Sequence, residues 1–303
     1  MTLRVGFIGF GEVASVFSKA LREHSVPVAA YDHHLEREGE EMLRRRALAQ
    51  GIEFRPLPEL VGSVDYVLST VNACAAGEVA ATCAQYLRRG QVYVDMNSTA
   101  PAVKVEMKNT LIASGADFID SVILEPVSIT GARTKILTCG EKGKEVAEAL
   151  TMAGLCAAFY SSEVGKASTF KMLRSVFAKG VQALILEMLI AGRRAGIEQD
   201  LWRDISDFIT QNQFERVAAN WIRSYAVNYE RLYLEIEQVA STVQELDMDP
   251  IMTAATKAFF HRSRSLGLKE AFPEKPESMD AVVDFLERQL AGADPAVGES
   301  PIN

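Results

Sequence analysis

Lys171 is the residue whose type and position most directly suggest chemistry. It lies in the stretch GKASTFKMLRSVFAKGVQALILEML, residues 165–189, which has the apolar spacing of one long helix. At about 100° per residue, Lys171 shares a narrow strip with small and polar residues, while the large apolar side chains face elsewhere. This spacing is compatible with a lysine on a pocket floor and equally with a lysine that reaches the surface from an interface helix. The other members of the strip are Ser168, Ser175, Ala178 and Gln182.

A lysine that faces a pocket could transfer protons. An alcohol that loses a hydride must also lose its hydroxyl proton, and a carbonyl that gains a hydride must gain one. A free lysine has a pKa of about 10.4, which is too high for an efficient base at neutral pH. Partial burial and a nearby cation such as Arg174 would both lower the pKa of Lys171. Arg174 could also hold a substrate carboxylate, or form a structural salt bridge.

The N-terminal stretch RVGFIGFGEVAS has the spacing of a phosphate-binding turn. Gly9-x-Gly11-x-x-Ala14 follows an apolar run and opens a helical segment. Gly9 permits a tight turn, Gly11 lets the backbone approach a pyrophosphate, and Ala14 allows close packing of helix on strand. The free N–H groups of the helix start would face the phosphates. The loop residues expected to bind a dinucleotide are Gly9, Phe10, Gly11, Glu12 and Val13.

Asp32 ends the second apolar run, where an acidic residue accepts hydrogen bonds from the adenosine ribose. A carboxylate at this position would repel a 2′-phosphate and therefore favours NAD. His33, His34 and Arg37 could instead attract that phosphate. We expect NAD as the cofactor, with NADP as the alternative.

The elements that must position these residues differ between the two halves of the chain. Up to about residue 163, apolar runs alternate with helical segments, and further strands are expected within residues 64–71, 91–97, 117–124 and 134–140. This alternation predicts an α/β, Rossmann-type, doubly wound parallel sheet domain. Beyond it the pattern is helical throughout. We therefore expect an NAD(P)-binding Rossmann domain at residues 1–163 and an all-α domain at 164–303, which begins with a long interdomain helix and serves substrate binding and dimerisation.

Two segments carry more specific expectations. Residues 35–50, LEREGEEMLRRRALAQ, have the composition of a charged and exposed helix. Residues 180–192, GVQALILEMLIAG, form the most apolar window but contain Glu187 and are too short to span a bilayer. We interpret this window as part of a buried core helix.

Composition excludes several classes of function. The net charge of −8 argues against a broad nucleic-acid footprint. The 4 cysteines form no C-x-x-C pair, and the 4 histidines do not fall at ligand spacing with them, so no metal site is expected. Isolated cysteines indicate a reducing compartment. The N-terminus lacks the features of a signal peptide, so we expect a cytoplasmic protein without a membrane partner.

Three motifs together resemble the β-hydroxyacid dehydrogenase superfamily, which includes hydroxyisobutyrate and phosphogluconate dehydrogenases. GFIGFGEVAS is similar to its cofactor loop, and DMNSTAP, residues 95–101, is similar to its D-x-S-T-x-x-P segment. GKASTFKMLRSV is similar to the helix that carries its catalytic lysine, which would be Lys171. The resemblance covers nearly the whole chain and is strongest to a branch whose C-terminal domain is of unknown function.

The resemblance also implies roles for individual residues. Lys171 would be the general acid and base. Residues that would line the cofactor are Val71, Asn72 and Asn97, and those that would hold the substrate are Ser98, Arg174, Ser175 and, as a weaker anion anchor, Arg231.

The substrate loop departs from the family pattern. The usual D-x-P-V-S-G-G becomes Asp120 followed by SVILEPVSITG, which displaces Pro126-Val127 and lacks the paired glycines. Ser175 stands where relatives have asparagine, and Ala178 where phosphogluconate dehydrogenase has an acidic residue. The reaction class can therefore be carried over, but not the named substrates.

We expect an NAD(P)-dependent oxidoreductase that transfers a hydride between nicotinamide and the hydroxyl or carbonyl carbon of a small hydroxy acid or oxo acid. One alternative is an imine reductase on the same fold, and another is a dinucleotide-binding regulator without turnover. The long apolar helix, with Trp202 and Trp221 in the helical half, predicts a homodimer.

Overall fold

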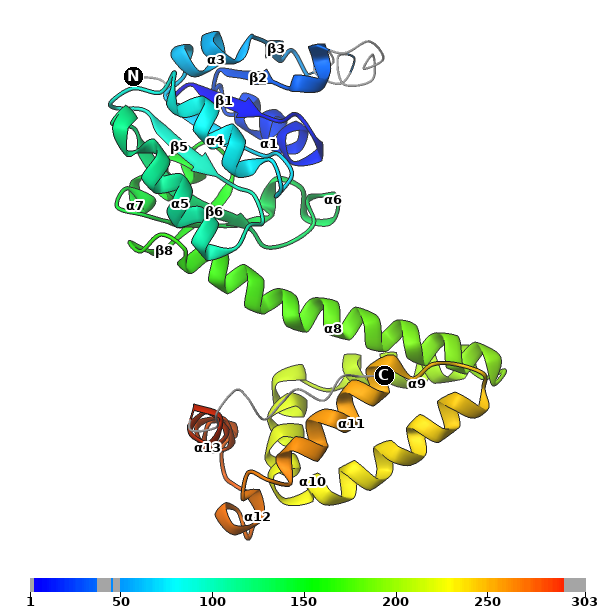
Figure 1. Ribbon diagram of the computed structural model, residues 1–303. Helices are drawn as coiled ribbons and strands as arrows, with labels where there is room; N and C mark the ends of the chain where they lie inside the picture. Colours follow the sequence, from blue (N-terminus) through cyan, green and yellow to red (C-terminus); the bar gives the residue numbers. More distant parts are fainter. Residues whose placement is uncertain (1–2, 37–44, 46–49, 292–303) are drawn as a thin grey trace. The chain divides into compact units, whose positions relative to one another are not determined.

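The computed structural model describes residues 3–36, 45 and 50–291 of the chain, and Figure 1 shows their course. The chain forms two compact units, Met1–Phe177 and Ala178–Asn303. The division falls inside a long helix, later than the boundary at residue 163 expected from the sequence. Most of the expected charged helix at residues 35–50 lies outside the described residues.

The first unit is built on an eight-stranded sheet with the strand order β3-β2-β1-β4-β5-β6-β7-β8. Its first six strands follow the Rossmann order, in which the chain reverses direction across the sheet between β1 and β4. The expected Rossmann fold is confirmed, but β7 runs antiparallel to β6, so the sheet is not wholly parallel. The strands are β1 (Val5–Ile8), β2 (Val28–Tyr31), β3 (Glu53–Phe54), β4 (Tyr66–Ser69), β5 (Val92–Asp95), β6 (Asp117–Ile123), β7 (Lys135–Cys139) and β8 (Cys156–Ser161).

Helices cover both faces of this sheet, so strands such as β1 and β5 are buried on both sides. One apolar core joins the sheet to α1 (Glu12–Glu23), α6 (Val127–Thr130) and α7 (Gly143–Met152). The other joins it to α3 (Leu57–Ser63), α4 (Ala76–Ala84) and α5 (Pro101–Leu111). This arrangement leaves the carboxyl ends of β1, β4 and β5 at one edge, where a ligand can bind.

The second unit is helical, as expected. A small core forms where α10 meets the C-terminal helices, around Tyr225, Tyr229, Leu268 and Val282. The elements are the later part of α8 (Lys166–Arg194), then α9 (Glu198–Gln211), α10 (Phe214–Glu245), α11 (Ile251–Ser263), α12 (Leu268–Ala271) and α13 (Met279–Ala291).

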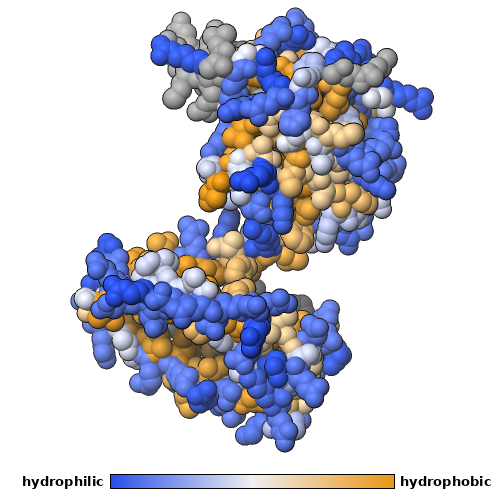
Figure 2. Space-filling view, turned by 180° about the vertical axis from the view of Figure 1, so that it is seen from behind, coloured by the Kyte–Doolittle hydropathy of each residue, from blue (hydrophilic) through white to orange (hydrophobic). Residues whose placement is uncertain are grey.

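Helix α8 spans the residues expected for the long helix, but its apolar window is not a buried core. Of residues 180–192 only Gly192 is buried, and Leu186 is 53% exposed. The expectation was wrong because the helices of the second unit cover only part of the α8 surface. By length and composition alone α8 could cross a membrane, but one such helix is weak evidence for a span. Figure 2 shows apolar residues at the surface of this unit among hydrophilic ones.

Glu187, the charged residue of that window, has a structural role. Its carboxylate accepts hydrogen bonds from the backbone N–H groups of Met252 and Thr253, at 2.7 and 2.9 Å, and from the Thr253 hydroxyl at 2.6 Å. These N–H groups belong to the first turn of α11 and have no partner within that helix. Glu187 therefore caps α11 from the side of α8.

Candidate functional site

The loop after β1 has the backbone geometry of a phosphate-binding turn. Gly9 has a φ of +83°, and a β-carbon built on it would lie 2.8 Å from the Thr70 carbonyl oxygen. Gly11 is the N-cap of α1, and a β-carbon there would meet no atom within 4 Å. A glycine is thus required at position 9 by the backbone conformation and by the contact with Thr70, whether or not a ligand is bound. Gly11 keeps open the space in front of the helix start, where a pyrophosphate would bind.

Asp32 ties this loop to the end of β2. It is 8% exposed, and its carboxylate accepts hydrogen bonds from the backbone N–H groups of Phe10 at 2.7 Å and His34 at 3.0 Å. The Phe10 side chain is buried against Phe54, so only its backbone belongs to the loop surface. Each carboxylate oxygen keeps a lone pair that a ribose hydroxyl could use. His33 and His34 are exposed beside it, within reach of the same end of a dinucleotide.

A cavity of about 540 Å³ opens beside the turn, at the carboxyl ends of β1, β2 and β4. Its size and position suit the adenosine half of a dinucleotide. Asn72 also starts α4 by accepting a hydrogen bond from the Ala75 N–H at 2.8 Å. Of the residues expected to bind the cofactor, this cavity brings together Gly9, Gly11, Asp32, Val71 and Asn72.

A second cavity, of about 270 Å³, shares Thr70 and Val71 with the first. Lys171 lines it together with Asn97 and Ser98, which follow β5. The remaining lining residues are Glu12, Val13, Met96, Ile123, Glu125, Pro126 and Val127. The structure therefore brings Lys171 to a cavity that adjoins the one beside the glycine turn, with Thr70 and Val71 in the walls of both.

The surroundings of Lys171 lower its pKa to about 8. The main cause is burial, which disfavours the charged ammonium, and the positive charges of Lys104 and Arg174 add to it. Burial and Arg174 were expected from the sequence, whereas Lys104 was not. A lysine with this pKa exchanges a proton readily near neutral pH.

The expected substrate residues outside this cavity make other contacts. Arg174 Nη1 donates to the Leu124 carbonyl oxygen at 2.5 Å, and the Ser175 hydroxyl donates to the Lys171 carbonyl oxygen at 2.8 Å. Arg231 belongs to α10 in the second unit, where it forms an exposed ion pair with Glu235 at 3.3 Å. None of these three residues lines either cavity, so their substrate roles stay predictions.

A buried charge cluster beneath the site was missed in the sequence. Lys104 is fully buried, with its ammonium nitrogen 2.6 Å from Asp95 and 3.3 Å from Asp120, both of them fully buried carboxylates. A sequence signal existed: Lys104, Met107 and Leu111 lie on one face of α5, and all three are buried. The sequence analysis did not single out Lys104, because a lysine is rarely buried unless it is paired, and its partners Asp95 and Asp120 lie elsewhere in the chain.

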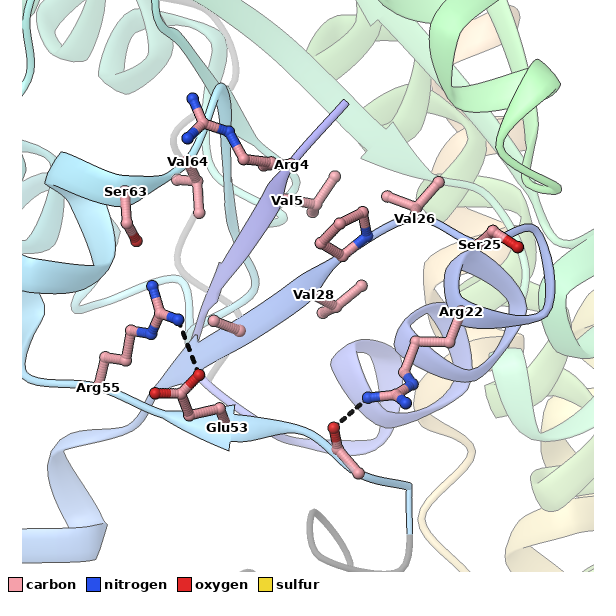
Figure 3. A pocket seen from close by; sticks show the side chains of 13 residues that line it. Arg4, Val5, Arg22, Ser25, Val26, Val28, Glu53, Arg55, Ser63 and Val64 are labelled. Carbon is pink, nitrogen blue, oxygen red and sulfur yellow. Dashed lines mark hydrogen bonds and ion pairs between the residues drawn. The ribbon is translucent and has the colours of Figure 1, made fainter. Parts of the chain in front are cut away.

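A further cavity, of about 450 Å³, lies at the amino ends of β1 and β2 (Figure 3). Its three arginines already have partners. Arg4 pairs with Asp65 at 2.8 Å, Arg55 pairs with Glu53 at 2.7 Å, and Arg22 donates to the Gly51 carbonyl oxygen. This cavity lies at the opposite strand ends from Lys171 and is not part of the candidate site.

Strand order, glycine turn and paired cavities together define an NAD-binding domain of the oxidoreductase type. The chain belongs to the family described as the NAD binding domain of 6-phosphogluconate dehydrogenase, which matches residues 4–179. The resemblance to the β-hydroxyacid dehydrogenase superfamily is thereby confirmed.

Two curated proteins are similar over most of the chain. An uncharacterized 28.5 kDa protein of Methanothermus fervidus is 27% identical over 259 residues, which cover 85% of this chain and 98% of the relative. The 2-(hydroxymethyl)glutarate dehydrogenase of Eubacterium barkeri is 21% identical over 318 residues, which cover 98% of this chain and 99% of the relative.

Solved structures extend the similarity. A conserved protein of unknown function, described as structurally similar to 3-hydroxyacid dehydrogenases, is 30% identical with a TM-score of 0.57, covering 88% of this chain and 97% of its own. A reductive aminase from Aspergillus terreus in complex with NADPH4, cyclohexanone and allyl amine is 12% identical with a TM-score of 0.75, covering 94% of this chain and 100% of its own. The V8 variant of an imine reductase from Myxococcus stipitatus, in complex with NAD+, is 17% identical with a TM-score of 0.73, covering 94% of this chain and 100% of its own. At these low identities, the last two show the fold alone.

Proposed function

We propose that this protein is an NAD(P)-dependent dehydrogenase of small hydroxy acids, in which Lys171 is the general acid and base. A bound nicotinamide would supply the hydride acceptor for the carbinol carbon in oxidation and the hydride donor in reduction. In oxidation the neutral amine of Lys171 removes the hydroxyl proton; in reduction its ammonium protonates the carbonyl oxygen. Each direction thus moves one hydride and one proton.

One observation carries this proposal: Lys171, with a pKa lowered to about 8, lines the cavity that continues from the dinucleotide turn. The Asn97 amide and the Ser98 hydroxyl line the same cavity and can orient the substrate oxygen and the carboxamide of the nicotinamide. The similarity to 2-(hydroxymethyl)glutarate dehydrogenase supports a hydroxy acid as the substrate class.

The test is a screen of small 2- and 3-hydroxy acids and their oxo partners, each with NAD and NADP, followed by Lys171→Ala on the best substrate. Loss of a general acid–base group costs about 10²- to 10⁴-fold in turnover. We expect a loss in this range with NADH affinity unchanged, while Lys179→Ala, an exposed lysine of the same helix, keeps full activity. Full turnover in Lys171→Ala would refute the mechanism, and NADH binding without any turnover across the screen would favour a regulator.

A second candidate, reduction of a C=N bond, is supported by the charges of the cavity. Glu12 and Glu125 line it, and no arginine is among its lining residues. Two carboxylates in the cavity wall would stabilise a positively charged iminium substrate and would repel a substrate that carries a carboxylate. Amine and ketone mixtures tested beside oxo acids separate the two candidates, and Glu125→Gln should weaken the binding of a cationic substrate only.

We also propose that the protein is a cytoplasmic homodimer joined through its helical unit. Several large apolar side chains of that unit are about half exposed, more than an isolated helical unit needs to leave in water. They are Leu184, Leu186 and Ile190 of α8, Trp202 and Phe208 of α9, and Trp221 of α10. Light scattering after gel filtration should give twice the 33.2 kDa chain mass. Leu186→Asp should shift the species towards monomer, whereas Ile129→Asp, at an exposed residue of α6, should not.

A further inference from the structure

Lys104 is the most completely enclosed cation of the described residues, and the reaction proposed above does not use it directly. Besides its two carboxylate partners, its ammonium group donates to the Asp95 and Ser121 carbonyl oxygens, at 2.9 and 3.1 Å. All these partners lie on β5 and β6, while Lys104 itself lies on α5. A buried lysine is costly unless it is fully paired, so this one joins three elements at a single point.

We propose that Lys104 is a positioning residue that joins the two walls of the Lys171 cavity, holding the start of α8 through Asp120 and the Asn97 side chain through Asp95. The inference rests on the proposed function, because it assigns Lys104 to the geometry and charge of the same proton-transfer site.

Asp120 contacts the start of α8, the helix that carries Lys171. Asp120 accepts hydrogen bonds from the Gly165 N–H at 2.9 Å, the Ser168 N–H at 3.3 Å and the Ser168 hydroxyl at 2.9 Å. Gly165 immediately precedes α8, Ser168 lies in its first turn, and Lys171 follows Ser168 by about one helical turn. Because Lys104 orients Asp120, it also determines where α8 begins and in which direction Lys171 projects.

Asp95 contacts Asn97, which lines the same cavity as Lys171. Asn97 Nδ2 donates to Asp95 Oδ1 at 2.5 Å and to the Ser69 hydroxyl at 2.9 Å. With its amide nitrogen held in this way, Asn97 is 4% exposed and can present only its oxygen to the cavity. A loss of the Lys104 charge would leave two buried carboxylates without a cation between them. The contacts of Asp120 with α8 and of Asp95 with Asn97 therefore both depend on Lys104.

Lys104 also acts on Lys171 through space. The charged groups around the Lys171 amine are Lys104 of α5, Arg174 of its own helix, Asp95 and Asp120 at the strand ends, and Glu12 and Glu125 across the cavity. Lys104 and Arg174 lower the pKa of Lys171, and among the described residues Lys171 has no carboxylate in ion-pair contact. Removal of the Lys104 charge should therefore raise that pKa.

The experiment measures the pKa of Lys171 without a substrate. The full-length protein is acetylated briefly across a pH series, and mass spectrometry of the Lys171 peptide gives the rate at each pH. Lys104→Gln removes the charge but can still donate hydrogen bonds, Lys104→Arg keeps the charge, and Lys108→Gln changes an exposed lysine of the same helix. Circular dichroism and the cooperativity of thermal unfolding show whether each variant is folded.

We expect the labelling midpoint of Lys171 to rise by about one pH unit in Lys104→Gln, to remain near the wild-type value in Lys104→Arg, and not to move in Lys108→Gln. A folded Lys104→Gln protein with the wild-type midpoint would overturn the inference. If Lys104→Gln does not fold, Asp95→Asn is measured in its place. Loss of this nearby negative charge should lower the labelling midpoint of Lys171. An unchanged or higher midpoint would overturn the inference. Turnover is not measured, so a failed substrate screen leaves this result intact.

Discussion

Gly9 and Thr70 approach so closely that a β-carbon on Gly9 would lie 2.8 Å from the Thr70 carbonyl oxygen. The Thr70 hydroxyl also donates to the Gly9 carbonyl oxygen at 2.8 Å. The end of β1 and the end of β4 are thus held together where the strand order reverses, and the dinucleotide cavity opens beside this contact.

Substitutions of the two loop glycines should have different effects. Gly9→Ala introduces a clash with backbone and a strained positive φ, so we expect it to destabilise the domain by about 1–3 kcal/mol. Gly11→Ala meets no protein atom but fills the space in front of α1, so we expect normal stability and at least about tenfold weaker NADH binding. Thermal melts and fluorescence titrations measure both effects. Gly62→Ala, in a helix with equal free space, should leave NADH binding unchanged and should not destabilise the domain.

The pH dependence of the reaction should follow the pKa of Lys171. Oxidation needs the neutral amine, so kcat/KM for the hydroxy acid should increase up to about pH 8 and level off above it. Reduction needs the ammonium, so kcat/KM for the oxo acid should be level below about pH 8 and decrease above it. Profiles measured in both directions check this reversal, and a common direction of change would contradict Lys171 as the proton carrier.

The contribution of Asp32 to cofactor choice can be measured directly. Asp32→Asn keeps an acceptor for the Phe10 N–H but removes the negative charge that opposes a 2′-phosphate. We expect the ratio of NADP to NAD affinity to increase by about tenfold or more, because juxtaposed like charges cost several kcal/mol. Glu78→Gln, which also removes a carboxylate from the cavity wall, is the matched control and should change the ratio less. Equal changes would assign the effect to net charge alone.

The cap on α11 predicts a stability effect far from any chemistry. Glu187→Gln replaces a carboxylate that accepts from Met252, Thr253 and the Thr253 hydroxyl. Loss of the charged acceptor at a helix start should lower the free energy of unfolding by about 1–2 kcal/mol. Urea unfolding and hydrogen exchange of the α11 amides measure it. Glu235→Gln, which breaks only an exposed pair with Arg231, should cost much less.

Local patterns were enough to predict the Rossmann domain, the glycine turn and the extent of α8. Each depends on residues close together in the sequence: apolar runs ending in glycine, the spacing of Gly9 and Gly11, and a helical period sustained without a break. The same patterns missed the edge strands β3 and β8 and the antiparallel direction of β7, because strand direction and edge pairing depend on partners elsewhere in the chain.

The sequence by itself determined the class of fold, the NAD-binding turn and the presence of a lysine on a polar strip of a long helix. Only the tertiary structure decided that Lys171 shares a cavity with Asn97 and Ser98, and that Lys104 lies buried between two aspartates. The apolar window of α8 was misjudged for a related reason, since hydrophobicity shows that a surface favours burial but not what covers it. Burial and the charges nearby set the pKa of a side chain, and both depend on residues that are distant in the sequence and meet only when the chain folds.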